Sequence, residues 1–353
     1  MSPKPVTSGR DQSRSPGSGA SKAAGSWLAA MLLPLLVLAG LASLGAGVRT
    51  VSPVEIWQAV TAYDPANPLH VTVIDIRLPR LWAGLVAGGA LGLAGSIMQA
   101  LTRNPLADPG LLGVGSGAAF AVVFGSLLLG ASDSGLLSML AFPGAAIASA
   151  AVFALGGGLR GDVGPVRLTL AGAALHALLL SLVSAVVLVR SDALDILRFW
   201  VAGSLSEAGQ RPLLPMTIVA VLAAGLALAM APVLETLSLG SGLSRGLGTR
   251  LWQAQGGALL AVTLLMGAAV AIAGPIGFLG LMVPPLARRF SGHRLGIELV
   301  ASAMIGAIIL LVADTAGRLI LPPGEVRAGV MTAVIGGPVF VLIARRMRQG
   351  ASA

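Results

Sequence analysis

The side chains best suited to chemistry are few in this chain and lie far apart. Its three histidines are His70, His176 and His293, and it has no cysteine. Thiolate ligands, disulfides and cysteine nucleophiles are therefore excluded, and no H-E-x-x-H metal motif occurs. A phosphate-binding loop ending in Gly-Lys is also missing, because no glycine precedes a lysine. The sequence predicts a protein with no metal, no cofactor and no catalytic residues, which cannot be its own ATPase.

His176 is the ionisable side chain that lies most clearly in the middle of an apolar run. An imidazole in this setting can hydrogen-bond a neighbouring helix or contact a transported substrate, and both roles stay open. No apolar run carries the buried acidic or basic array that a proton or sodium relay requires. We therefore expect passage of a substrate without an energy source in this subunit.

Two motifs rich in glycine and proline interrupt the apolar pattern. The first is MQALTRNPLADPGLLG, Met98–Gly113, and the second is GPIGFLGLMVPPLAR, Gly274–Arg288. They follow the second and seventh predicted spans, so they fall at matching places in two repeats, spans 2–5 and 7–10, of inverted orientation. Paired breaks of this kind are typical of transport pathways. The alternative is that glycine and proline are simply frequent in membrane helices.

Long apolar runs must position these motifs. Only 10% of the 353 residues are charged, and 56% are hydrophobic. A bilayer core needs about 20 apolar helical residues per crossing. We predict an all-α polytopic membrane protein with about ten transmembrane helices. The predicted spans are residues 27–47, 80–101, 110–130, 138–158, 167–189, 213–233, 254–274, 275–289, 296–313 and 328–344.

The placement of arginines predicts the topology. Arg245 and Arg250 precede the apolar stretch 254–287, and Arg288 and Arg289 follow it. Basic loops favour the cytoplasm, so this stretch should cross twice, with a short or re-entrant eighth span. Both termini are then expected in the cytoplasm.

The remaining segments have simpler expected roles. Residues 1–25 are rich in serine, glycine and proline and are expected to form a disordered cytoplasmic tail, followed by a ten-helix permease domain over 26–346 and a short tail over 347–353. A signal peptide is disfavoured because the first apolar run is too long. Residues 192–204 predict a short helix on the outer surface, with Trp200 at headgroup depth.

Together with IRLPR at Ile76–Arg80, ADTAGR and VMTAVIGGPVF, the two broken motifs resemble those of the FecCD-type permeases. These are membrane subunits of ABC importers for iron–siderophores, haem and vitamin B12. The similarity runs from Trp27 to Arg346. It implies two permease subunits, identical or different, around a central pathway, two cytoplasmic ATPases, and an outer substrate-binding protein, in a bacterial inner membrane.

The function implied is ATP-driven import by alternating access, with ferric siderophores as the expected cargo. Cobalamin and haem are alternatives within the family. An ion-coupled secondary transporter is the alternative from another class.

The resemblance also implies roles for particular residues. Arg77, Arg80 and Arg318 would present exposed guanidiniums to acidic groups of the binding protein. Alternatively, Arg77 and Arg80 snorkel to the interface, and Arg318 pairs with Asp314 one helical turn away.

Further positions would serve coupling, gating and passage. Leu237–Arg250 would form the coupling loop that docks on the ATPase, with Leu239, Gly242, Arg245 and Gly248. Asn104 and Leu106 would line the cytoplasmic gate, although Asn104 could instead cap the next helix. The pathway itself would be lined by Thr169, His176, Ser181 and Ser184.

Overall fold

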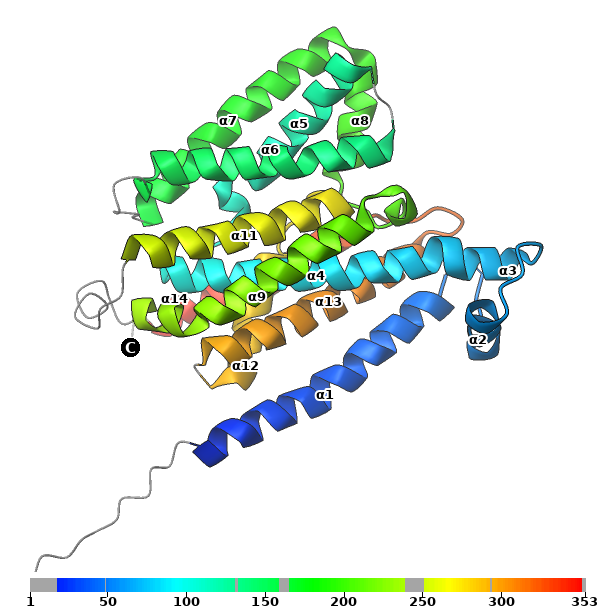
Figure 1. The fold of residues 1–353 in the computed structure, drawn as a ribbon, viewed down its shortest axis with the longest axis horizontal. Helices are drawn as coiled ribbons and strands as arrows, with labels where there is room; N and C mark the ends of the chain where they lie inside the picture. Colours follow the sequence, from blue (N-terminus) through cyan, green and yellow to red (C-terminus); the bar gives the residue numbers. More distant parts are fainter. Residues whose placement is uncertain are drawn as a thin grey trace, which may run out of the picture.

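A computed structural model describes residues 18–350 except 48, 131–132, 159–164, 239–250 and 293, and these described residues form helices joined by turns and loops (Figure 1). The long helices are α1 Ser18–Gly45, α4 Leu78–Thr102, α5 Val114–Leu129, α6 Ser134–Leu155, α7 Pro165–Val189, α9 Leu213–Ser238, α11 Leu251–Ala273, α12 Leu279–Ser291, α13 Leu295–Ile320 and α14 Ala328–Gly350. The short ones are α2 Pro53–Thr61, α3 Pro68–Val71, η1 Thr72–Arg77, η2 Pro109–Leu112, α8 Ser191–Val201 and η4 Ala208–Gln210.

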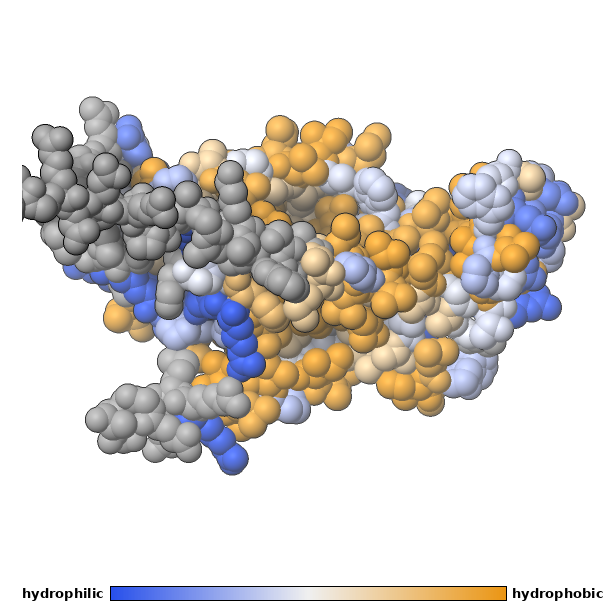
Figure 2. All heavy atoms as spheres, turned by 90° about the horizontal axis from the view of Figure 1, so that it is seen from below, coloured by the Kyte–Doolittle hydropathy of each residue, from blue (hydrophilic) through white to orange (hydrophobic). Residues whose placement is uncertain are grey.

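Each predicted span overlaps one long helix, and the all-α membrane fold is confirmed. Six helical segments of the described residues are long and apolar enough to cross a bilayer. Helix α12 has only 13 residues, in keeping with the short eighth span. Apolar atoms cover the middle of the molecule and hydrophilic atoms gather at both ends (Figure 2). Helix α1 begins inside the segment expected to be a tail.

The bundle has two ends, which we name after one arginine at each. The Arg77 end holds the start of α4 and the end of α13, and the Arg288 end holds the end of α4 and the start of α13. Helix α1 starts at the Arg288 end and α14 finishes there (Figure 1). The two ends of the described chain therefore lie on the same side.

Helices α4 and α13 are the central pair. A Cβ added to Gly92 would lie 2.1 Å from the carbonyl oxygen of Ser302, so only glycine allows this approach. The hydroxyls of Ser96 and Ser302 are 2.7 Å apart at the same contact. Small residues and interhelical hydroxyl bonds are the usual means of close helix packing in lipid. The pair is therefore locked together near its middle.

The helices α5 to α8 form a separate layer on one side of α11, whereas α4, α9 and α13 lie on the other side (Figure 1). Within this layer α7 is barely covered. Only 11% of the most apolar part of α7 is buried, against 72% of the most apolar part of α11. A single subunit thus leaves most of α7 facing its surroundings.

Candidate functional site: a cavity between two helix breaks

The first break begins where α4 ends. Arg103 adopts a left-handed conformation with φ of 51°. The Asn104 Oδ1 atom accepts a hydrogen bond from the Leu106 backbone N–H at 3.0 Å, and Asp108 Oδ1 accepts one from Gly110 N–H at 2.6 Å. Asp108 therefore caps η2, while Asn104 caps a turn. The side-chain amide at the predicted gate orients the backbone of the break.

The second break separates α11 from α12. Gly274 has φ of 69°, and Phe278 has φ of 66°, a conformation that non-glycine residues rarely adopt. The last carbonyls of α11 still have donors: Ser204 N–H binds Ala273 at 2.8 Å, and Arg211 Nη1 binds Ile272 at 3.0 Å. The carbonyl groups at the end of α11 therefore keep hydrogen-bond donors where the helix stops.

Arg211 makes this second contact from a buried position. Burial lowers the pKa of its guanidinium, and Glu207, 3.7 Å away, opposes that shift by favouring the charged form. Gly203, in the same loop, also contacts the second break: a Cβ on Gly203 would come within 2.4 Å of the Pro275 carbonyl oxygen. The loop after α8 thus packs tightly against the second break.

The two breaks meet inside the molecule. A Cβ on Gly280 would lie 2.8 Å from Pro109 Cγ, which joins the two motifs directly. Beside this contact is a cavity of about 270 Å³. Its wall includes Asp108 from the first break and Pro275 from the second, together with His176 of α7. Irregular backbone at membrane depth is tolerated where it is buried in protein or lines a cavity.

Trp200 also lines this cavity, and its surroundings differ from those predicted for an interfacial helix. Only 7% of the residue is exposed, so its indole is covered by protein instead of lying open to lipid headgroups. The helix α8 is present, yet it packs against α5 and α7 and places Trp200 against the second break. The indole Nε1 has no hydrogen-bond partner among the described residues.

The predicted pathway residues of α7 separate into two groups. His176 lines the cavity and is exposed in the single subunit. Thr169, Ser181 and Ser184 are also exposed but do not belong to the described wall of this cavity. The Ser181 and Ser184 hydroxyls donate to carbonyls of their own helix, each at 2.8 Å. The geometry therefore brings only His176 of this set to the breaks.

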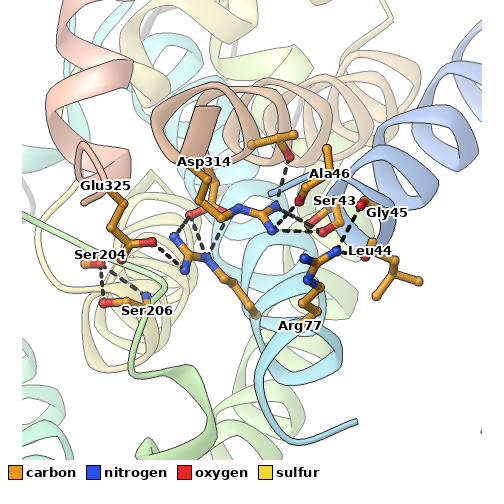
Figure 3. A network of polar contacts seen from close by, with 12 residues as sticks. Ser43, Leu44, Gly45, Ala46, Arg77, Ser204, Ser206, Asp314 and Glu325 are labelled. Atoms are coloured by element: carbon orange, nitrogen blue, oxygen red, sulfur yellow. Dashed lines mark hydrogen bonds and ion pairs between the residues drawn. The ribbon is translucent and has the colours of Figure 1, made fainter. Parts of the chain in front are cut away.

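The arginines at the Arg77 end are buried, contrary to the expected exposure. The exposed fractions of Arg77, Arg80 and Arg318 are 5%, 5% and 7%. Arg80 grips the carboxylate of Asp314 with Nε and Nη2, at 2.8 to 3.0 Å, and its Nη1 reaches Glu325 at 2.8 Å. Figure 3 shows Asp314 and Glu325 converging on this cluster.

Arg77 and Arg318 bind the C-terminal end of α1. Their guanidiniums donate to backbone carbonyls of Ser43, Leu44, Gly45, Ala46 and Arg49 (Figure 3). These carbonyls at or just beyond the helix end lack partners within α1, and positive charge is favoured there. Arg318 also pairs with Asp314 at 3.3 Å, which was the alternative reading of that residue.

A second polar cluster lies at the Arg288 end. Arg288 Nε donates to Glu298 Oε1 at 3.1 Å, and its Nη2 donates to Gln99 Oε1 at 2.6 Å. The Gln99 amide in turn donates to the Leu281 carbonyl at 3.2 Å. A cavity of about 350 Å³ opens beside these side chains. No sequence motif indicates this cluster, because its members come from three different helices.

The predicted coupling residues Leu239, Gly242, Arg245 and Gly248 lie outside the described residues. The described helices on either side of this segment are α9, which ends at Ser238, and α11, which begins at Leu251. Within the described ranges no group of three histidine or acidic side chains is placed to hold a metal ion.

A bundle of membrane-length helices with two paired breaks beside a cavity defines a transport permease. The profile of the FecCD transport family matches residues 35–346, and the chain belongs to this family of ABC importer permeases. It is a transport subunit, and the importer architecture entails partner ATPases and a substrate-binding protein.

Individual relatives cover nearly the whole chain. It is 44% identical to the ferric enterobactin transport system permease protein FepD of Escherichia coli over 319 residues, 90% of this chain and 95% of that one. It is 36% identical to the iron(3+)-hydroxamate import system permease protein FhuB of Bacillus subtilis, covering 90% of this chain and 83% of that one. A solved metal-chelate type ABC transporter in an inward-facing conformation has a TM-score of 0.76 at 26% identity, covering 91% and 99%.

Proposed function

We propose that this chain forms the translocation pathway of an ATP-driven importer of ferric siderophores. The observation that carries the pathway is the cavity where the two helix breaks meet, with Asp108 and Pro275 on its wall. Broken helices are the usual construction of substrate pathways in transporters built from inverted repeats. The proposed cargo follows from the relative that transports ferric enterobactin at 44% identity.

We further propose that the Arg288 end faces the cytoplasm. Arg103, Arg289 and Arg345 are exposed there, whereas Asp64 and Asp75 are exposed at the other end. This charge distribution agrees with the rule that basic loops stay inside. Both chain termini are then cytoplasmic. Because the chain has no cysteine, Arg103→Cys and Asp64→Cys give single labelling sites. Impermeant reagent added to whole cells should label only position 64.

The complete importer needs a second permease subunit, and we assign α7 to that contact. Its mostly uncovered apolar face and the exposure of His176 in one subunit support this placement. The second subunit would close the cavity on its α7 side. Thr169, Ser181 and Ser184 would then face the space between the subunits.

We place the binding protein at the Arg77 end and the ATPases at the Arg288 end. Arg77, Arg80 and Arg318 are committed to internal contacts, so their proposed role in docking is to hold the outer ends of α1, α4 and α13 as one platform. Residues 239–250 remain the proposed coupling loop, and Asn104 and Leu106, at the start of the first break, remain the proposed inner gate.

The test of the function uses vesicles that contain this permease, its ATPases and its binding protein. Uptake of radiolabelled ferric enterobactin that requires ATP is the expected result. Uptake of haem or cobalamin instead would contradict the cargo, and uptake driven by an ion gradient without ATP would contradict the class.

The pathway has its own test with a pair of exposed leucines. Leu180 of α7 lines the cavity, and Leu222 is exposed on α9, away from the cavity and from the proposed subunit contact. A bulky maleimide on Leu180→Cys should block uptake, whereas the same reagent on Leu222→Cys should leave it intact. Equal uptake by the two labelled variants would remove the cavity from the pathway.

A further inference from the structure

The contact between α9 and α13 at the Arg288 end has an unusual position. Glu235 lies on the last turn of α9, which ends at Ser238. Its Oε1 accepts a hydrogen bond of 2.6 Å from the backbone N–H of Leu295, the first residue of α13. A carboxylate at a helix start meets unpaired N–H groups and the positive end of the dipole, so this bond is charge-assisted. The end of α9 is thereby fastened to the start of α13.

Three residues after Leu295, on the same first turn of α13, a second set of polar contacts begins. Glu298 lies in the first turn of α13 and accepts from Arg288, on the last turn of α12, at 3.1 Å. Arg288 then donates to Gln99 near the end of α4 at 2.6 Å. Four helix ends are therefore connected in series through Glu235, Glu298, Arg288 and Gln99.

This chain of contacts leads to the transport cavity. Helix α12, which carries Arg288, starts at Leu279, directly after Phe278, the last residue of the second break. The preceding residues, Ile276 and Gly277, form part of the cavity wall. With only 13 residues, α12 is a short connection between the polar cluster and the break. A displacement of its Arg288 end must move the break or bend the helix.

The cluster also has room to rearrange. Gln99, Glu235, Arg288 and Glu298 all border the cavity of about 350 Å³, and 35% of the Arg288 side chain is exposed. Coupling between sites requires an element with more than one arrangement, and a polar cluster at helix ends beside a cavity can provide one.

We propose that Glu235, Glu298, Arg288 and Gln99 are positioning residues that pass movement of the end of α9 to the second break. This inference rests on the proposed function, because it assumes that the ATPases act on the chain next to the end of α9. Movement of the end of α9 shifts Glu235, and Glu235 moves the start of α13. The pair Glu298–Arg288 then carries the shift into α12 and the cavity wall.

The test measures ATP hydrolysed per ferric enterobactin imported in reconstituted vesicles. Glu235→Ala should raise this ratio by about fivefold or more, the lower range of typical coupling between sites. The amount of ATPase that co-purifies should not change. Glu235→Gln keeps an acceptor for the Leu295 N–H and should restore most of the coupling. Glu55→Ala, on α2 at the other end, is the matched control and should leave the ratio at the wild-type value.

A merely structural role gives a different result. Lower thermal stability with uptake and ATP hydrolysis falling together, at a constant ratio, would overturn the inference. A double-mutant cycle of Glu235→Ala with Arg288→Met adds a second criterion: we expect effects on the logarithm of the ratio that do not add, and additive effects would also overturn it. If the wild-type vesicles show no ATP-driven uptake, the proposed function itself fails, which is a distinct outcome.

Discussion

The two polar clusters bind the same helix pair at opposite ends, yet they are built differently. At the Arg77 end three guanidiniums, each under a tenth exposed, are held by Asp314 and by the carbonyls at the end of α1. At the Arg288 end one partly exposed guanidinium bridges Gln99 and Glu298 beside a cavity. The first arrangement fixes three helices in one geometry. The second joins α4, α12 and α13 beside a cavity and leaves them room to shift.

The energetic difference follows from burial. Removing one partner of a buried ion pair leaves an uncompensated charge, which costs about 3–5 kcal/mol. Removing one hydrogen bond of a partly exposed group costs roughly 0.5–1.5 kcal/mol. The comparison therefore predicts an order of effects, and each substitution below tests one step of it.

Asp314→Ala should cause the largest loss. It leaves Arg80 and Arg318 without their shared carboxylate in a buried site, so we expect about 3–5 kcal/mol less stability. Thermal unfolding in detergent is the measurement, with Asp195→Ala on the exposed face of α8 as control. If Asp314→Ala lowers thermal stability no more than Asp195→Ala does, the Arg77 end is not the more rigidly held end.

Gly92→Ala comes next, because it separates α4 from α13 between the two clusters. The added Cβ would collide with the Ser302 carbonyl, and overpacking of this kind costs about 1–3 kcal/mol. Gly225→Ala in α9 meets no atom within 4 Å and should be neutral or slightly stabilising. If both alanines are tolerated equally, the close contact is not a constraint on the pair.

Gln99→Leu should cost less, roughly 0.5–1.5 kcal/mol, because Gln99, although buried, is a neutral amide and Arg288 keeps Glu298 as its charged partner. The same unfolding measurement applies. A loss as large as that of Asp314→Ala would abolish the contrast between the two ends.

Glu325→Gln should have the smallest effect, below about 1 kcal/mol. Its side chain is 33% exposed, so water screens its pair with Arg80, and the Asp314 contacts remain. A larger loss would mean that Glu325 is a principal support of the cluster.

The sequence predicted the helices well because apolar length is a local property. The runs around 80–101 and 296–313 became α4 and α13, and the Gly/Pro motifs became breaks. The partners of the arginines could not be predicted in the same way. Arg80 and Asp314 are 234 positions apart, and nothing near Arg80 indicates that a carboxylate will cover it.

Trp200 illustrates the same limit. Its amphipathic segment has the composition of an interfacial helix, and that helix exists as α8. Whether its tryptophan meets lipid or protein depends on where α5, α7 and the second break lie. Those contacts depend on tertiary structure. The composition of the segment therefore predicts the helix but not the residues that pack against it.

The most direct test of the contrast compares distances at the two ends. Because the native chain lacks cysteine, spin labels can be placed on exposed pairs: Leu41 and Leu319 on α1 and α13, and Val233 and Phe290 on α9 and α12. In the reconstituted importer, ATP should shift the Val233–Phe290 distance by about 2 Å or more and leave the Leu41–Leu319 distance unchanged. Equal shifts of both pairs, or no shift of the first, would contradict the account.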